Sequence, residues 1–301
     1  MNDRTAPRSI EQYLAALRVA LAGEDPALVQ DALYDAEEYL RAEVAANSGG
    51  SEADTLELIS STYGAPEEVA EAYRTTEKQV RTALAPPPRK PSRTAFGRFF
   101  GVYGDSRTWT ALFYMLLALV TGIFYFTMTV AGLSMSAGLL VMIIGIPFFL
   151  LFIGATRGLA LVEGRIVEAM LGTRMPRRPL FPDRETPWLT RIVDMLKDPR
   201  TWGTIVYLLL MLPLGIFYFV FAVVGLTVSL AMIAAPIVML LWHGHLIQID
   251  GVVETPHPAL LPLMSILGIV LLTVTLHLSR GIGYLHGQVA KSLLVSSTRA
   301  D

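Results

Sequence analysis

Three histidines in the last third of the sequence come nearest, by residue type and spacing, to a chemical site. His243 and His245 form a His-Gly-His pair, and His257 follows in a segment that also carries Asp250 and Glu254. Imidazole and carboxylate groups are ligands that zinc accepts in proteins. The spacing matches no established metal motif, and no residue is in place to orient the imidazoles. We therefore predict neither a metal nor another cofactor, and we interpret the three histidines as residues of a membrane interface.

The rest of the sequence offers no catalytic constellation. There is no cysteine, which excludes a thiol nucleophile, a thiolate zinc site and an iron–sulfur cluster. The formal net charge is −2, so no basic field points to nucleic acid. We therefore expect a protein that is not an enzyme and does not bind nucleic acid directly.

Two long stretches without charge determine the class of protein. Charged residues make up 17% of the chain and hydrophobic residues 53%, yet the stretches 108–156 and 201–249 contain no Asp, Glu, Lys or Arg. Each is more than twice as long as the roughly 20 residues that a helix needs to cross a bilayer. The sequence therefore predicts a polytopic membrane protein. The lack of charge inside these stretches argues against a proton pump or ion-coupled transporter.

The membrane region contains an internal repeat. Asp105-Ser-Arg-Thr-Trp109 returns 93 residues later as Asp198-Pro-Arg-Thr-Trp202, and a glycine–aromatic cluster returns at the same offset. Small residues in such clusters let membrane helices approach closely, with aromatic side chains packed beside them. We predict that the packing residues of the two copies are Trp109, Gly122, Phe124, Tyr125, Phe126 and Gly132, and Trp202, Gly215, Phe217, Tyr218, Phe219 and Gly225.

Each copy ends in a segment with polar and apolar faces, 157–171 and 280–295, related by an offset of 123 residues. Such helices lie in the plane of the membrane interface. We therefore expect four charged residues of these segments to lie at the interface: Arg157, Glu163, Arg165 and Arg280.

Charge in the connections predicts how the chain crosses the membrane. The basic linker 86–106 and the basic connection 157–200 indicate cytoplasmic segments, and with them a cytoplasmic N-terminus. Residues 247–259 contain no Lys or Arg and indicate an exterior loop, whereas the basic tail after 280 indicates a cytoplasmic C-terminus. Four crossings satisfy all these signs if the chain turns after Gly132 and Gly225 and if 226–246, interrupted at Pro236, is re-entrant or buried on the exterior side. Five crossings with an exterior C-terminus are the alternative.

Residues 1–85 predict a separate helical bundle with an acidic surface. They contain 7 Lys and Arg against 16 Asp and Glu. Ser9 with Gln12 resembles a capping box, and Asp25 before Pro26 is a typical helix start. The acidic face is explained by exposure to solvent, or alternatively by docking of a basic partner.

The N-terminal residues resemble the HAAS signalling domain, a small helical module found beside membrane segments in bacterial proteins. The resemblance is carried by Tyr13-Leu14 with Leu17, by the acidic stretch 35–39, and by Gly64, Pro66 and Ala70. It implies a partner such as a transcription factor of the PadR type.

Residues 97–295 resemble a bacterial sensor transmembrane domain that often precedes histidine-kinase modules. The resemblance is carried by an ordered series of motifs: Gly122 to Phe126, Gly132 to Ser134, Gly145 to Pro147, Arg157 to Arg165, Leu171-Gly172 and Asp198 to Trp202. No kinase region follows, so we expect the output to pass through the N-terminal bundle or a separate kinase.

The sequence thus predicts an all-α protein with a small N-terminal bundle and a duplicated membrane domain. Its parts are an acidic bundle (1–85), a Pro-rich basic linker (86–106), a first membrane repeat (107–197) and a second (198–301). We expect a non-enzymatic sensor in the bacterial inner membrane that contacts membrane lipids, relays a stimulus to a cytosolic regulator and could form a homo-oligomer. The alternative is a transporter or a lipid-handling protein, because tandem membrane repeats often enclose a central path.

Overall fold

A computed structural model gives the fold of the chain. It describes residues 7–47, 52–84, 94–139, 145–178, 190, 193, 196–241, 248–249, 252–253 and 260–295.

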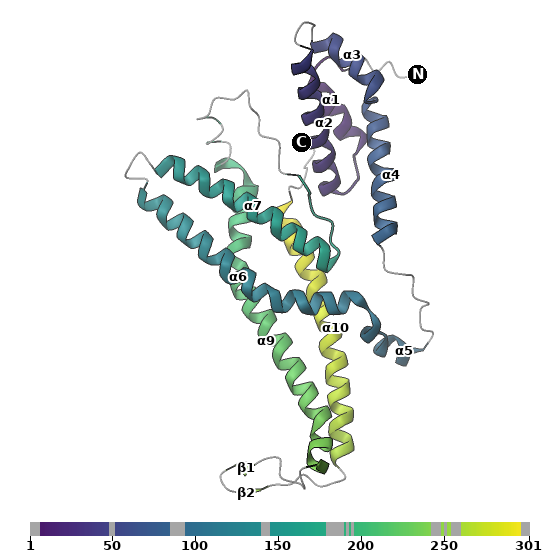
Figure 1. Ribbon diagram of the computed structural model, residues 1–301, viewed down its shortest axis with the longest axis vertical. Coiled ribbons are helices and arrows are strands. Elements are labelled where there is room, and N and C mark those ends of the chain that lie inside the picture. Colours follow the sequence, from purple (N-terminus) through teal and green to yellow (C-terminus); the bar gives the residue numbers. More distant parts are fainter. Residues whose placement is uncertain are drawn as a thin grey trace.

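Four helices form the N-terminal bundle (Figure 1): α1 (Ile10–Ala20), α2 (Pro26–Ala46), α3 (Glu52–Thr62) and α4 (Pro66–Leu84). The predicted caps are present, since the Ser9 side chain accepts from the backbone N–H of Gln12 and the Asp25 side chain accepts from that of Ala27. The helices close over a core of fully buried side chains that includes Tyr13, Leu17, Leu21, Leu40 and Leu56.

Four long helices form the membrane half: α6 (Ser106–Leu139), α7 (Gly145–Leu171), α9 (Pro199–Leu241) and α10 (Leu261–Leu294). All four are long and apolar enough to cross a membrane, which confirms the all-α polytopic fold and agrees in number with four crossings. Short elements also occur: α5 (Ala95–Phe100), the 3-10 helix η1 (Gly101–Gly104) and the paired strands β1 (Gln248–Ile249) and β2 (Val252–Val253).

The chain does not turn where the sequence predicted. Helix α6 continues through Gly132, and α9 continues through Gly225 and Pro236 to Leu241. The predicted re-entrant segment 226–246 is therefore wrong, because its described part is the second half of α9. Ser136 and Ser229 each bond to the carbonyl oxygen four residues earlier, Gly132 and Gly225, so these polar groups are satisfied within a continuous helix.

The two amphipathic segments are not separate interfacial helices. Residues 157–171 are the last half of α7, and 280–294 are the last turns of α10. A helix that continues from an apolar half into a charged half keeps its backbone bonds unbroken, which a separate interfacial helix would lose at the turn.

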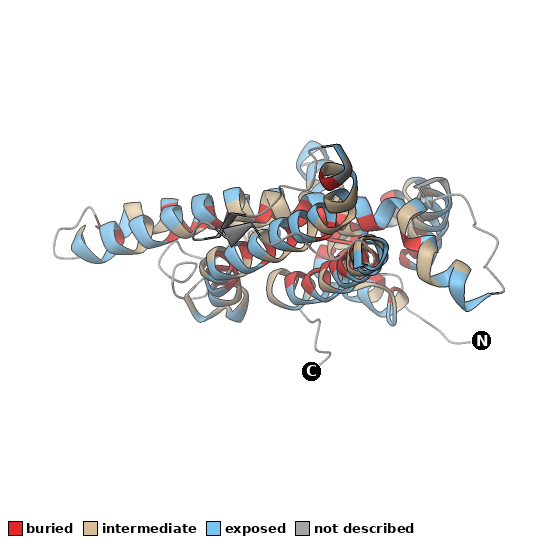
Figure 2. Cartoon of the chain, turned by 90° about the horizontal axis from the view of Figure 1, so that it is seen from below, coloured by how far each residue is buried: buried red, intermediate tan, exposed pale blue. Residues whose placement is uncertain are grey.

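The helical hairpins α6–α7 and α9–α10 meet at one end and diverge toward their tips (Figure 1). Buried residues gather where the hairpins meet, whereas the outer faces of the long helices are mostly exposed (Figure 2). Exposed Phe113, Phe124 and Phe217 are examples, as expected for side chains that face lipid.

Two glycines set how closely α6 and α9 cross. A Cβ at Gly122 would collide with the carbonyl oxygen of Met211, and a Cβ at Gly215 would collide with that of Ala118. Each glycine of one helix therefore lies against the backbone of the other helix, and the two contacts match at the 93-residue offset.

Candidate functional site

A buried polar cluster lies where the two hairpins meet. Glu163 on α7 has no exposed surface. Its Oε1 accepts from the hydroxyls of Tyr114 on α6 (2.7 Å) and Tyr207 on α9 (3.0 Å). Its Oε2 accepts from the hydroxyl of Tyr125 (3.0 Å). Three hydroxyl donors thus satisfy a carboxylate that would otherwise be very costly to bury.

His286 on α10 completes the cluster from the opposite side. Its Nε2 lies 2.6 Å from the Tyr114 hydroxyl and 3.0 Å from the Tyr207 hydroxyl, and its Nδ1 lies 3.1 Å from the Tyr218 hydroxyl. Tyr114 and Tyr207 each donate their single hydroxyl proton to Glu163, so the Nε2–H of His286 must donate to both hydroxyl oxygens. Nδ1 then accepts from Tyr218 when the ring is neutral and donates to Tyr218 when the ring is charged.

The cluster is built from matching positions of the two copies. Tyr114 and Tyr207 lie 93 residues apart, as do Tyr125 and Tyr218, and Glu163 and His286 lie 123 residues apart. The first copy supplies the carboxylate and the second supplies the imidazole at the same place in the pattern. Chemically, the arrangement can hold a proton between α7 and α10 or pass one along the tyrosine hydroxyls.

Two ion pairs at matching positions of the two copies also join the hairpins. Arg280 on α10 pairs with Asp105 at the start of α6 (2.9 Å), and Arg157 on α7 pairs with Asp198 at the start of α9 (3.6 Å). Each aspartate also caps its helix by accepting a backbone N–H two residues on. The hairpins are therefore joined by polar contacts as well as by packing.

Residues 172–178 form a connecting segment between this cluster and the N-terminal bundle. Gly172 ends α7 with φ +72°, a left-handed conformation that favours glycine. Thr173 then lies against Gly287, the neighbour of His286, where an added Cβ would collide with its side chain. Met175 is buried, and its Cβ would be 3.4 Å from a Cβ added at Gly164, the neighbour of Glu163.

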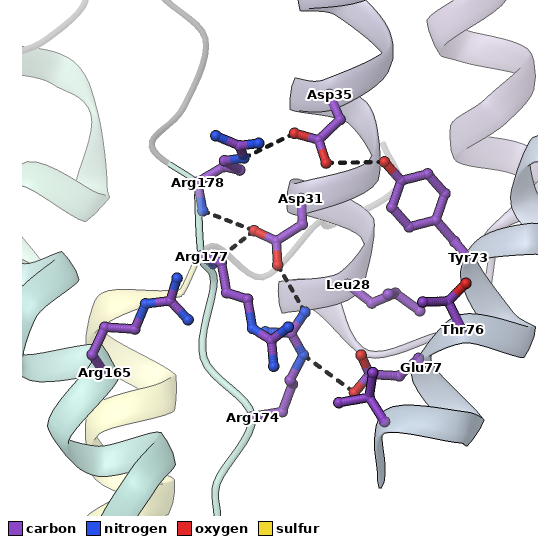
Figure 3. A pocket seen from close by; sticks show the side chains of 11 residues that line it. Leu28, Asp31, Asp35, Tyr73, Thr76, Glu77, Arg165, Arg174, Arg177 and Arg178 are labelled. Atoms are coloured by element: carbon purple, nitrogen blue, oxygen red, sulfur yellow. Dashed lines mark hydrogen bonds and ion pairs between the residues drawn. The ribbon is translucent and has the colours of Figure 1, made fainter. Parts of the chain in front are cut away.

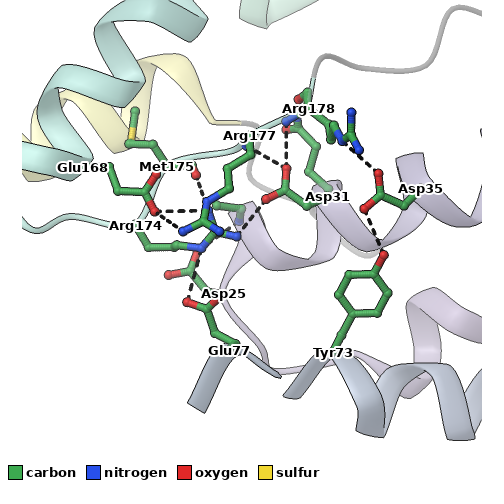
Figure 4. Close-up of polar contacts among 12 residues, drawn as sticks. Asp25, Asp31, Asp35, Tyr73, Glu77, Glu168, Arg174, Met175, Arg177 and Arg178 are labelled. Carbon is green, nitrogen blue, oxygen red and sulfur yellow. Dashed lines mark hydrogen bonds and ion pairs between the residues drawn. The ribbon is translucent and has the colours of Figure 1, made fainter. Parts of the chain in front are cut away.

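Arg174, between these two residues, contacts the bundle instead. Its side chain is 8% exposed, and its guanidinium pairs with Asp31 of α2 at 2.8 Å and with Glu77 of α4 at 3.3 Å. It also pairs with Glu168 of α7 at 3.4 Å. Figure 4 shows Arg174 and Arg177 reaching toward these carboxylates from the connecting segment.

Asp31 is held by backbone as well as by side chain. Its Oδ1 accepts from the backbone N–H groups of Arg177 (2.7 Å) and Arg178 (2.9 Å), and Arg178 pairs with Asp35 at 2.9 Å. These residues surround a pocket of about 340 Å³ between the bundle and α7, in which four arginines face two aspartates and Glu77 (Figure 3).

Further contacts place the acidic bundle against basic residues of the membrane half. Lys291 on α10 pairs with Asp25 at 2.5 Å, and Arg200 on α9 donates to Gln30 at 2.6 Å. This part of the acidic face therefore lies against basic residues of the same chain. Docking of a separate basic partner stays a prediction.

The bundle side of this contact is reinforced by Tyr73 on α4, whose hydroxyl donates to Asp35 at 3.0 Å. Burial and the nearby Asp35 carboxylate raise the pKa of Tyr73 above its ordinary value. The tyrosine therefore stays neutral and remains a donor through the physiological range.

The predicted packing residues divide between core and surface. Tyr125, Tyr218, Gly122 and Gly215 are buried, and Phe126, Phe219, Gly132 and Gly225 are partly buried. The expectation that Phe124 and Phe217 fill the interior is wrong, because they are 51% and 57% exposed. Trp109 and Trp202 are half-exposed, and their indole N–H groups donate to the backbone of Tyr103 and Leu196.

The predicted interface residues also need one correction. Glu163 does not face a membrane interface but lies in the core, because three tyrosine hydroxyls there satisfy its charge. Arg165 and Arg280 are exposed, and Arg157 is partly exposed.

The candidate metal ligands His243, His245 and His257 lie outside the residues that the structure describes. Within those residues, no three His, Asp or Glu side chains are placed to hold a metal ion.

Sequence reasoning missed Tyr114, Tyr207 and the role of His286. The 93-residue offset relates the two tyrosines, and the 123-residue offset relates His286 to Glu163. Extending the repeat alignment to every polar residue would have identified both matched pairs, but not that the pairs contact each other.

Comparison with known proteins adds one match. A family model described as "Putative sensor" matches residues 114–294, which contain all six members of the cluster. No match was found among curated proteins or among solved structures.

Proposed function

The chain belongs to this sensor family, and we propose that it relays the state of its membrane half to a cytosolic regulator through the N-terminal bundle. The observation that carries the proposal is the connecting segment 172–178. Thr173 and Met175 contact the residues next to His286 and Glu163, while Arg174 between them holds Asp31 and Glu77 of the bundle.

The relay follows from the contacts of successive side chains in the segment, because Thr173 and Met175 contact the membrane half while Arg174 contacts the bundle. A shift of α7 against α10 changes the room available to Thr173 and Met175. The backbone that carries them also carries Arg174, so the guanidinium moves relative to its carboxylates. A buried ion pair tolerates little displacement before its desolvation cost exceeds its attraction. Small movements in the membrane half are thereby converted into docking or release of the bundle.

We place the bundle on the cytoplasmic side of a bacterial inner membrane. Arg174, Arg177, Arg178, Arg200 and Lys291 all lie on the side of the membrane half that faces the bundle, and basic residues favour the cytoplasmic side. A four-helix bundle agrees with the HAAS resemblance, so the released surface would present its acidic residues to a PadR-type transcription factor or a separate kinase.

A single added methyl group tests the relay. Gly287→Ala puts a Cβ where Thr173 lies, whereas Gly158→Ala on α7 puts one into open space. We would immobilise the full-length wild type and both variants in detergent, incubate them with cytosol of the native host, and identify retained proteins by mass spectrometry. Double-label EPR between α2 and α10, using cysteines added to the cysteine-free chain, would report docking of the bundle.

We expect Gly287→Ala to change both the docking distance and the amount of one retained DNA-binding regulator or kinase, with Gly158→Ala like wild type. Unchanged docking in Gly287→Ala would refute the mechanical link. Altered docking without any retained regulator or kinase would refute the output.

A further inference from the structure

A groove between α6 and α10 has the chemistry of a phospholipid headgroup site. Its volume is about 430 Å³, and its lining includes the polar side chains of Arg107, Arg280, His277 and Tyr284. We propose that this α6–α10 groove binds the phosphate of an anionic phospholipid. The site does not depend on the relay, because its test measures lipid binding alone.

Charge in the groove is only partly compensated by the protein. Arg280 pairs with Asp105 at 2.9 Å and is still 53% exposed. Arg107 is exposed, and its guanidinium makes no hydrogen bond or ion pair to the residues that the structure describes. Two guanidinium groups against one carboxylate leave one positive charge, which matches a singly charged phosphodiester. Arginine binds phosphate oxygens through paired N–H donors.

The position of the groove points to lipid rather than to a dissolved anion. Arg107 immediately precedes the uncharged stretch 108–156, and Arg280 immediately follows the uncharged run 258–279. Both residues therefore lie where charge begins again beside an apolar helix, at the level of lipid headgroups. On the same face of α10, Val274 and Val270 lie one and two turns before His277 and are 37% and 38% exposed, a surface for an acyl chain.

The matching place in the other copy is built differently. Offsets of 93 and 123 residues relate Arg107 to Arg200 and Tyr284 to Leu161, and His277 to Gly154. Arg200 is already bonded to Gln30 of the bundle, and leucine and glycine supply no polar side chain. Only one of the two matching places therefore combines an unpaired guanidinium with a hydroxyl and an imidazole.

Contacts with Phe99 fix the position of His277, which lines the groove. Its Nε2 lies 2.9 Å from the backbone oxygen of Phe99, and its ring stacks on the Phe99 ring at 5.6 Å. These contacts tie α5 to α10 beside the groove, so the lining is set by packing rather than by the ligand. A preformed site loses less entropy on binding than a flexible one.

The test uses the full-length chain purified in a non-ionic detergent. Phosphatidylglycerol and phosphatidylcholine with identical acyl chains would be titrated separately, and bound lipid counted by native mass spectrometry. Glycerol phosphate would be added as a competitor without acyl chains. Arg107→Gln removes the unpaired guanidinium without breaking a described contact, and Arg98→Gln, at an exposed arginine of α5 outside the groove, is the charge-matched control.

We expect one phosphatidylglycerol to bind more tightly than phosphatidylcholine, and Arg107→Gln to weaken it about tenfold, the effect of one charge-assisted hydrogen bond. Arg98→Gln should bind as wild type does. Equal binding of the two lipids, or equal losses in the two variants, would overturn the site. Competition by glycerol phosphate at the concentration of the lipid would overturn the assignment to a membrane lipid.

Discussion

Replacing Arg174 by glutamine should release the N-terminal bundle from the membrane half. Arg174 is 8% exposed and pairs with Asp31, also 8% exposed, and with Glu77 and Glu168. The variant Arg174→Gln removes the positive charge but keeps a polar side chain of similar reach. Asp31 and Glu77 would then be buried beside each other without their common cation.

The size of the effect can be worked from these contacts. Removing one partner of a buried ion pair costs about 3–5 kcal/mol. Asp31 keeps the backbone N–H donors of Arg177 and Arg178, so we take the lower end, about 3 kcal/mol. That cost raises the fraction of undocked bundle about a hundredfold.

Cysteine labelling measures this fraction directly, because the chain has no cysteine of its own. Leu28 is 4% exposed, lines the pocket beside Arg174, and shares the face of α2 that carries Asp31. A Leu28→Cys reporter should react with a maleimide only when the bundle is undocked. Circular dichroism would confirm that the bundle helices stay folded in the variant.

Arg165 provides the matched control, because it lines the same pocket and also contacts Glu168, at 3.4 Å. Its side chain is 51% exposed, and exposed pairs contribute about 0–1 kcal/mol. Arg165→Gln should therefore change the labelling rate at most about fivefold. If Arg174→Gln labels at the wild-type rate, or if both variants are accelerated equally, the buried network does not hold the bundle.

Three further perturbations have expected outcomes. Gly122→Ala should lower the thermal stability of the full chain by about 1–3 kcal/mol through overpacking at the helix crossing, whereas Gly138→Ala, with open space around it, should not; equal melting curves would contradict the close contact. Burial and the Asp35 carboxylate raise the pKa of Tyr73 in the folded chain above its ordinary value of about 10. Above about pH 10 the unfolded chain therefore loses this proton before the folded chain does, and the free energy of unfolding should fall by about 1.4 kcal/mol per pH unit. Tyr73→Phe should make this decline less steep in an alkaline denaturation series. Glu163→Ala should destabilise the membrane half by about 1–3 kcal/mol for each tyrosine hydroxyl left without an acceptor. Glu163→Gln should destabilise it less, because the amide oxygen still accepts. Identical unfolding of the two variants in detergent would show that the hydroxyls find other acceptors.

Local rules predicted the elements whose causes are local. The cap at Ser9 and the helix start at Asp25-Pro26 depend on side chains within three residues of the helix, and both are present. The continuity of α9 through Pro236 was not predictable in this way. Proline removes one backbone donor, but in a long apolar helix ending the helix would expose many more polar groups to lipid.

Glu163 was misplaced because its environment depends on contacts between helices that are distant in sequence. The polar face of residues 157–171 was assigned to an interface, since charged residues of an isolated amphipathic helix face water. Tyr114 and Tyr207 lie in stretches counted as hydrophobic, although each carries a hydroxyl donor. A helix-by-helix reading cannot show that four tyrosines from α6 and α9 meet one carboxylate and one imidazole.

The docking of the bundle was half predictable for a similar reason. The acidic excess of residues 1–85 and the basic character of 157–200 are visible in the sequence. Their pairing is not, because charge complementarity sets which surfaces attract but not which residues meet. The position of Arg174 is set by Thr173 and Met175, whose packing against two glycines is a property of the folded membrane half.

Glu163 and His286 occupy matching positions of the two copies. Both can bond to Tyr114 and Tyr207 because Glu163 accepts hydrogen bonds and His286 donates them. The hydroxyls of Tyr114 and Tyr207 each have one proton, and both protons go to Glu163. A second carboxylate in place of His286 would find no proton left on either hydroxyl and would place two like charges in the core. An imidazole N–H instead donates to both tyrosine oxygens, so every group is satisfied. The cluster therefore requires one acceptor from α7 and one donor from α10, and neither hairpin can build it alone. The connecting segment contacts the neighbours of both groups, Gly164 and Gly287, so within the described residues it touches both hairpins beside the cluster.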